Sequence, residues 1–353
     1  MTKIAMIPGD GVGPEVMAEA SKLLETLRET YHLDLESATF DLGADYTLET
    51  GLALPEGIID ELKGGYKGIL MGPLGDPRIH DDRHVKVIIS GLIRHLDLYA
   101  GLRRIRVLSD DLFPLANKNA KAVDLALIWE SRGGVHAGAG TVIEKGTTGE
   151  IVVEEQIETR KRVEQVIRFA FDYAMGNRRS KVTLVHRSRA YPYGRDLWIR
   201  TFQEVQEDYP DMAGSRMGLD AAIQQLMTAP ETLDVIVTNH LLGSILSSLG
   251  TALQGGPGLV ASSNLHPGQV GLFRPLHSAS SKYAGKDYAN PMAAMLSVQD
   301  LMEFLGKKRI SRDIGRALKK ALKSGWVTRD LGGSMGTREV ADYVCSAISE
   351  SKS

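Results

Sequence analysis

Three alternating glycines near the start of the chain could form a loop that holds phosphate. Gly9, Gly11 and Gly13 lie in the stretch IPGDGVGPEV, between an apolar run and a segment with helical periodicity. Glycine-rich turns that lead into a helix can bind dinucleotide phosphates, because backbone N–H groups face the anion. The dinucleotide fingerprint spaces its glycines as G-x-G-x-x-G, and this stretch does not. The loop therefore predicts a strand–loop–helix entry, and a structural turn explains it at least as well as a ligand-binding loop.

The elements that must position such a loop alternate between strands and helices. Short apolar runs bounded by polar residues or glycine predict buried strands at 3–7, 68–72, 125–129, 181–185 and 234–238. Apolar residues at helical spacing predict helices at 14–31, 158–175, 195–207, 219–228, 292–305 and 312–323. Pro14 suits the first turn of a helix, because its missing N–H would be unpaired there. The alternation indicates an α/β fold with a substantial parallel component.

The composition is that of a folded, nearly neutral protein. The 353 residues are 43% hydrophobic and 24% charged, which suffices for two domains or one large α/β unit. The net charge of −2 gives no long-range attraction to nucleic acid or to membranes. A single cysteine, Cys345, excludes an intrachain disulfide and fits a reducing compartment. We expect a cytoplasmic protein with a small-molecule substrate and neither a nucleic-acid nor a membrane partner.

Eight segments, in order along the chain, resemble landmarks of the isocitrate/isopropylmalate dehydrogenase family, the metal-dependent β-decarboxylating dehydrogenases. They are PGDGVGPEV, GPLGDPR, LDLYAGLRR, GGVHAG, DLWIR, PETLDVIVTN, HSASSKYAGKDYANP and DLGGSMGT. The resemblance implies an α/β fold of two domains with a large mixed sheet and no Rossmann domain. It implies a larger domain of residues 1–100 and 250–353 that carries the cofactor's adenosine segment. Residues 101–249 would form a smaller domain with the dimer interface and the substrate-side and metal-side residues.

The segment 277–291 resembles the one that wraps the adenosine half of the cofactor in this family. The resemblance places His277 and Asn290 at the adenine. Ser278 and Ser281 replace a glycine and a proline of the family pattern. A degenerate surface loop is therefore the alternative to a cofactor site.

Two neighbouring residues in this segment bear on which nicotinamide cofactor is used. NAD-using relatives carry an aspartate–isoleucine pair where this chain has Lys282 and Tyr283, and NADP-using isocitrate enzymes are similar to this chain there. An aspartate would repel a 2′-phosphate, whereas an ammonium group and a phenol hydroxyl can pair with it. We therefore expect NADP rather than NAD.

The metal site of the family requires three aspartates, and the resemblance supplies one of them, Asp220. The other two fall at Ser244 and Ser248, which are spaced i, i+4 in the stretch GSILSS. Magnesium is a hard cation that prefers anionic oxygen ligands, and two neutral hydroxyls do not replace two carboxylates in charge. We therefore expect the magnesium site to be lost or much weakened, with no requirement for magnesium.

The proton-transfer residues implied by the resemblance are also replaced. The relay lysine falls at Arg187, and a guanidinium stays charged in proteins. The relay tyrosine falls at His136, which can act as acid or base near neutral pH. An asparagine near the lysine has become Arg189, which adds positive charge to the expected metal region.

The substrate arginines implied by the resemblance are only partly present. Arg103 is retained. The other two positions hold Ile93 and Trp129, although Arg94 and Arg132 stand close to them in sequence. These two replacements predict an apolar or aromatic wall in the substrate pocket.

These replacements leave three hypotheses open. The first is a divergent NADP-linked oxidoreductase, with His136 and Arg187 in catalysis and an anionic, hydroxy-acid-like substrate held by the arginines. The second is a non-catalytic ligand-binding or regulatory homologue, and the third is a 3-isopropylmalate-type dehydrogenase. Residues 139–160 resemble the arm that interlocks dimers in this family, so we expect a homodimer.

Overall fold

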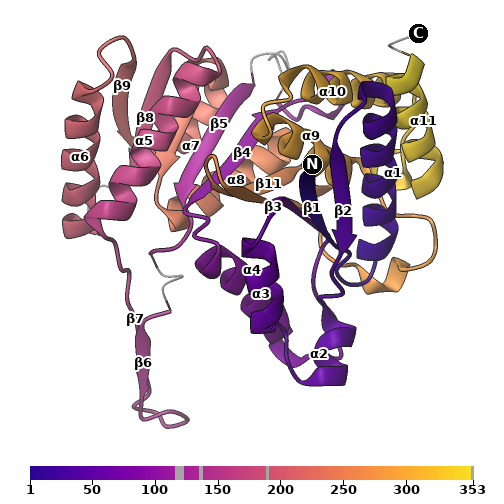
Figure 1. Cartoon of the computed structure of the whole chain (residues 1–353). Coiled ribbons are helices and arrows are strands. Elements are labelled where there is room, and N and C mark those ends of the chain that lie inside the picture. The colour runs from indigo at the N-terminus through magenta and orange to yellow at the C-terminus, as the bar shows by residue number, and fades with distance from the viewer. Residues whose placement is uncertain (116–122, 135–137, 188–190, 351–353) are drawn as a thin grey trace. The chain divides into compact units, whose positions relative to one another are not determined.

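The computed structural model describes residues 1–115, 123–134, 138–187 and 191–350. The chain forms two compact units (Figure 1). The first unit comprises Met1–Leu98, Val107–Ala116 and Thr251–Ser353, and the second comprises Tyr99–Arg106 and Asn117–Gly250. The chain therefore enters and leaves the second unit more than once.

The strands of the first unit are mostly parallel. They are β1 (Thr2–Ile7), β2 (Leu35–Thr39), β3 (Tyr66–Met71), β11 (Ala261–His266) and β12 (Val270–Pro275). Their order is β2-β1-β3-β12-β11, and only β11 is antiparallel to its neighbour β12 within the unit. The carboxyl ends of β1, β3 and β12 consequently lie at the same edge of the sheet.

Helices cover both faces of these strands. They are α1 (Gly13–Tyr31), α2 (Ala44–Thr50), α3 (Glu56–Lys63), α4 (Arg83–His95), α9 (Met292–Phe304), α10 (Lys308–Lys323) and α11 (Thr337–Glu350). On one face, Ile69 and Leu272 pack against Ile88 and Leu92 of α4. On the other face, a Cβ atom on Gly68 would lie only 2.3 Å from Leu301 of α9, so a glycine permits this close approach.

The second unit is built in the same way. Its strands are β4 (Ala100–Arg106), β5 (Asp124–Glu130), β8 (Lys181–His186), β9 (Ala213–Gly218) and β10 (Val235–Thr238), in the order β4-β5-β10-β8-β9. β4 is antiparallel to β5, and the other pairs are parallel. Its helices are α5 (Arg160–Gly176), α6 (Pro192–Glu207), α7 (Leu219–Thr228) and α8 (His240–Leu253). The ring centroids of Phe171 in α5 and Phe202 in α6 lie 5.4 Å apart, in a core that includes Val182 and Val235.

A two-stranded hairpin of β6 (Gly140–Ile143) and β7 (Ile151–Glu154) extends from the second unit (Figure 1). Every residue of both strands is exposed, including the apolar side chains of Val142, Ile143, Ile151, Val152 and Val153. An isolated hairpin with exposed apolar side chains is marginally stable at best.

The predicted α/β class with a large parallel component is confirmed, and each predicted strand and helix has a counterpart in the structure. Helix α6 begins earlier than predicted, at Pro192, because proline is favourable in a first turn. Within the described ranges, no helix combines the length and apolar character needed to cross a membrane.

Candidate functional site

The glycine loop after β1 joins backbone segments of the first unit. The amide of Val12 donates to the carbonyl of Ala279 at 2.8 Å, and the amide of Asp10 donates to Pro73 at 2.8 Å. Gly11 has a φ of 58°, and a Cβ atom there would lie 2.2 Å from the Ala279 carbonyl oxygen. The glycines therefore serve close backbone packing, which supports the structural turn of the two predicted alternatives.

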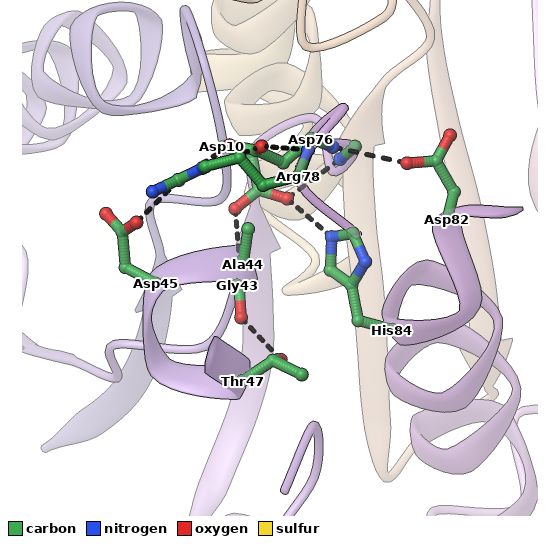
Figure 2. A network of polar contacts seen from close by, with 10 residues as sticks. Asp10, Gly43, Ala44, Asp45, Thr47, Asp76, Arg78, Asp82 and His84 are labelled. Atoms are coloured by element: carbon green, nitrogen blue, oxygen red, sulfur yellow. Dashed lines mark hydrogen bonds and ion pairs between the residues drawn. The ribbon is translucent and has the colours of Figure 1, made fainter. Parts of the chain in front are cut away.

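A buried polar network fixes the neighbouring loops (Figure 2). The carboxylate of Asp10 accepts hydrogen bonds from the amides of Ala44 at 2.7 Å and Gly75 at 2.8 Å. It also lies 3.0 Å from Nε2 of His84 in the first turn of α4. Asp76 binds the side chain of Arg78, and this hydrogen bonding lowers the pKa of Asp76. The network holds the loop after β3 against the loop after β1.

His277 begins the predicted cofactor segment, and its ring has one nitrogen without a partner. Nδ1 lies 3.1 Å from the carbonyl oxygen of Ser278, so this nitrogen carries the hydrogen. Burial lowers the pKa of His277, which favours the neutral ring. Nε2 is buried and has no hydrogen-bond partner. It is therefore an acceptor that could take a hydrogen bond from an exocyclic amino group such as that of adenine.

Asn290, the other residue predicted at the adenine, uses its side chain within the protein. Its Nδ2 donates to Asp330 at 3.0 Å, and its Oδ1 accepts from the amide of Met292 at 2.9 Å. It is 8% exposed. Asn290 thus satisfies a free N–H at the start of α9 and ties that helix to the turn at Asp330.

Lys282 and Tyr283 lie in an exposed row of cations and aromatic rings. Nζ of Lys282 lies 4.8 Å from the centroid of the Tyr283 ring, which lies 6.4 Å from the ring of Tyr288. Arg329 stacks over Tyr288 at 4.3 Å. Both tyrosines are more than one-third exposed, at 43% and 42%. Sequence reasoning did not single out Tyr288 within this segment. It missed Arg329 because only the fold brings Arg329 to this segment.

The predicted substrate arginines occupy different environments. Arg103 is 3% exposed and donates to the carbonyl of Ser247 at 3.2 Å. Arg94 is exposed in the last turn of α4, and Arg132 is partly buried after β5. Arg103 is thus placed to hold α8 against β4 within the second unit.

Ile93 and Trp129, the two residues of the predicted pocket wall, are both buried. Ile93 is buried in the core beside α4. Trp129 is 7% exposed, and Cβ atoms on Gly101 or Gly243 would lie 2.0 Å and 2.7 Å from its side chain. The indole therefore fills the space that these two glycines leave, and it packs instead of lining a site.

Of the predicted catalytic residues, His136 lies outside the described residues, as does Arg189. Arg187 is exposed directly after β8. It lines a hollow of the second unit with His186, Tyr191, Arg195 and Asn239.

This hollow is electropositive. None of the described residues that line it is acidic, and its walls include the guanidinium groups of Arg187 and Arg195. Neither guanidinium has a polar partner within the described ranges. Burial and the charges of Arg195 and Arg216 lower the pKa of His186, so its ring is neutral near pH 7. Each of these two guanidinium groups at the hollow can pair with a carboxylate or phosphate.

A partly buried carboxyl group lies beside this hollow, and sequence reasoning missed it. Glu158 accepts hydrogen bonds from Trp198, Gln156 and Asn239, and burial raises its pKa. It lines an adjoining hollow of about 480 Å³ with Tyr191 and other residues. A carboxyl group with a raised pKa can hold a proton closer to neutral pH than an ordinary glutamate.

Comparison with known proteins places the chain. A family model for isocitrate/isopropylmalate dehydrogenase matches residues 3–344. The chain belongs to this family. It is 34% identical to the 3-isopropylmalate dehydrogenase of Thermobifida fusca, over 99% of this chain and 98% of that protein. It is 32% identical to a probable tartrate dehydrogenase/decarboxylase of Agrobacterium vitis, over 99% of this chain and 98% of that protein.

A solved structure shares the whole fold. The isocitrate dehydrogenase of Methylococcus capsulatus superposes with a TM-score of 0.85 at 30% identity, covering 99% of both chains. The expected family fold is therefore confirmed.

The residues predicted at the family's metal positions do not fit a magnesium ion. Ser244 donates its hydroxyl hydrogen to the carbonyl of Leu241 at 2.9 Å, and Ser248 donates to the carbonyl of Ser244 at 3.0 Å. Both hydroxyls are thus engaged by the backbone of α8, and Asp220 is exposed in the first turn of α7. Throughout the described part of the chain, no group of three or more His, Cys, Asp or Glu residues could hold a metal ion. Neutral hydroxyls cannot supply the charge that this cation requires.

Proposed function

We propose that this member of the dehydrogenase family is an NADP-linked oxidoreductase for a small anionic hydroxy acid. It would transfer hydride without the magnesium-dependent β-decarboxylation of its relatives. The observation that carries the proposal is the exposed row of Lys282, Tyr283, Tyr288 and Arg329.

This row offers what a 2′-phosphorylated adenosine needs. The cations Lys282 and Arg329 stand at its two ends and can pair with phosphate oxygens. The faces of the two tyrosines can stack on adenine. The unpartnered Nε2 of His277 can accept a hydrogen bond from the adenine amino group. When bound, the cofactor supplies the nicotinamide that accepts a hydride.

The electropositive hollow of the second unit supports an anionic substrate. Arg187 and Arg195 can hold a carboxylate there, and a guanidinium can also stabilise a developing alkoxide. We assign Arg94, Arg103, Arg132 and Arg189 as further candidates for substrate binding. A bound nicotinamide would take up the hydride of the substrate carbon. The hydroxyl proton would then need a base, and we assign this role to His136.

Loss of the magnesium ligands restricts the reaction. In β-decarboxylation, electron density develops on an enolate oxygen, and a divalent cation normally stabilises it. Ser244 and Ser248 cannot hold that cation, so simple oxidation of the alcohol to a ketone is the reaction we assign.

The β6–β7 hairpin supports a homodimer. Its exposed apolar side chains would be covered if the hairpins of two copies paired, which would also stabilise the hairpin itself. We propose that residues 139–160 form this arm.

Calorimetric titration with NADPH and with NADH, each with and without magnesium, tests the proposal. Tight binding of NADPH that does not depend on magnesium is the expected result. If neither nucleotide binds, the non-catalytic homologue becomes the better description. Release of carbon dioxide from isopropylmalate, tartrate or isocitrate that requires a divalent cation would overturn the proposed reaction.

A further inference from the structure

Arg274 of β12 is a partly buried cation without an anionic partner in the described part of the chain. Its Nε is buried and makes no hydrogen bond. Within the described ranges, its one polar contact is a weak one, from Nη2 to Oδ1 of Asn264 at 3.5 Å. Burial lowers the pKa of Arg274 to about 10, which still leaves the guanidinium charged at neutral pH.

The carboxylates of Asp10 after β1, Asp76 after β3 and Asp300 of α9 have other partners. Asp10 is bound to two amides and to His84, and Asp76 is bound to Arg78. Asp300 accepts a hydrogen bond from Ser263. Ser263 follows Ser262, which pairs with Arg274 across strands β11 and β12. A partly buried charge without a counter-ion loses part of its hydration without compensation, so its presence requires another explanation.

The position of Arg274 indicates where a counter-ion would come from. It is the penultimate residue of β12, so it lies at the edge where parallel strands β1, β3 and β12 end. Open α/β sheets bind their ligands at the carboxyl ends of such strands. The loops that follow these three strands are the ones that the Asp10 network and the Val12–Ala279 hydrogen bond bring together.

The surroundings of Arg274 are polar on the same face. Ser262 of β11 lies directly opposite Arg274, and Asn264 lies opposite Leu272 two residues earlier. Both polar residues are 2% exposed. Residues paired across strands share a face, so a hydroxyl and an amide flank the guanidinium. This set can complete the coordination of an oxyanion but offers no negative charge of its own.

We propose that Arg274 is the anchor of an anion subsite at the carboxyl edge of the first unit, which binds a carboxylate or phosphate group of a ligand. The subsite does not depend on the chain being a dehydrogenase. The fork of the guanidinium forms paired hydrogen bonds with either group.

The test compares the full-length protein with Arg274→Met, which keeps the length of the side chain but removes the charge. Arg312→Met is the control, because Arg312 is an exposed arginine of α10 in the same unit. Melting temperatures and dissociation constants are measured at constant ionic strength with inorganic phosphate, NADPH and the hydroxy diacid tartrate. Phosphate and NADPH report a phosphate ligand, whereas tartrate reports a substrate carboxylate.

Without ligand, Arg274→Met should melt at the same or a higher temperature, because the unpaired charge is gone. It should lose roughly tenfold to a hundredfold in affinity for at least one anion, whereas the Arg312→Met variant keeps wild-type affinities. If the methionine variant does not fold, Arg274→Lys should fold and show a smaller loss of the same anion. The proposal fails if no anion stabilises the wild type, or if the variants bind all three anions as the wild type does.

Discussion

Nε2 of His84 lies 3.0 Å from the carboxylate of Asp10, and both side chains are almost fully buried. The pair joins the loop after β1 to the first turn of α4 (Figure 2). The same carboxylate accepts the amides of Ala44 and Gly75. Because the loop after β1 also bonds to the backbone of Ala279, Asp10 indirectly positions the predicted cofactor segment.

Replacement of Asp10 should therefore be costly for stability. Asp10→Ala leaves two buried amides and one imidazole nitrogen without their acceptor. We expect the free energy of unfolding to fall by about 3 kcal/mol or more, measured by urea denaturation. Asp41→Ala, at an exposed position nearby, should change it by less than about 0.5 kcal/mol. A similar small effect at Asp10 would show that the network is not a major support of the fold.

The cofactor preference can be tested at Lys282. Lys282→Asp should lower the affinity for NADPH by roughly tenfold to a hundredfold and the affinity for NADH much less. The reason is that an aspartate strongly repels only the additional phosphate of NADPH. Calorimetric titration measures both affinities. Lys319→Asp makes the same change of charge at an exposed position of α10 and should leave both affinities unchanged. Equal losses of NADPH and NADH at Lys282 would contradict a contact with the 2′-phosphate.

Arg329 provides a second test of the row, because it was not expected from the sequence. Arg329→Ala removes the cation above Tyr288. In the same titrations, the affinity for NADPH should fall by roughly tenfold and the affinity for NADH should stay nearly unchanged. If Arg329 only supports the position of Tyr288, the affinities for both nucleotides should fall together.

Glu158 should give the stability of the protein a distinct pH dependence. Burial raises its pKa in the folded state above its value in the unfolded chain. Its contribution to stability is therefore complete below the unfolded pKa and is lost as pH rises through the folded pKa. Glu130 has a pKa raised by burial too, and Glu158 adds to that shift.

Melting temperatures of wild type and Glu158→Gln between about pH 4 and pH 8 check this expectation. As the pH rises through this range, the melting temperature of the wild type should fall relative to that of the variant, because glutamine does not ionise. The difference between the two proteins should be largest at the alkaline end. A difference that does not change with pH would mean that Glu158 contributes only hydrogen bonds.

The hairpin predicts the oligomeric state. Val142→Asp with Val152→Asp places charges on paired, exposed positions of β6 and β7. We expect the wild type to be a dimer and this variant a monomer, by size-exclusion chromatography with light scattering. Lys145→Ala in the turn between the strands should remain dimeric. A dimer that persists in the double variant would place the interface elsewhere.

The sequence was most informative where elements are apolar and continuous. The runs of β5 and β10 were predicted because valine, leucine and isoleucine follow one another in strands buried on both faces. β11 was missed because its sequence, ASSNLH, is small and polar although most of it is buried. The packing of Trp129 was not predicted, because the glycines that accommodate it, Gly101 and Gly243, lie on other elements.

Site residues followed the same rule. The cofactor segment was predicted from a continuous motif, whereas Arg274, Arg329 and Glu158 carry no local signal. Their roles depend on what surrounds them: a missing counter-ion at Arg274, an aromatic ring at Arg329 and buried donors at Glu158. Such features arise from tertiary contacts, which no pattern of neighbouring residues encodes.

The proposed loss of the metal site should be open to partial reversal. Ser244→Asp with Ser248→Asp places two carboxylates one helical turn apart on the exposed side of α8. We expect magnesium to bind this variant weakly, with a dissociation constant on the order of millimolar, because two carboxylates restore the charge but not a full set of ligands. Calorimetric titration of the wild type should show no binding, and Ser244→Asn with Ser248→Asn, which has the same shape without the charge, should resemble the wild type. Submillimolar binding of magnesium by the wild type would contradict the conclusion drawn from the hydroxyl groups.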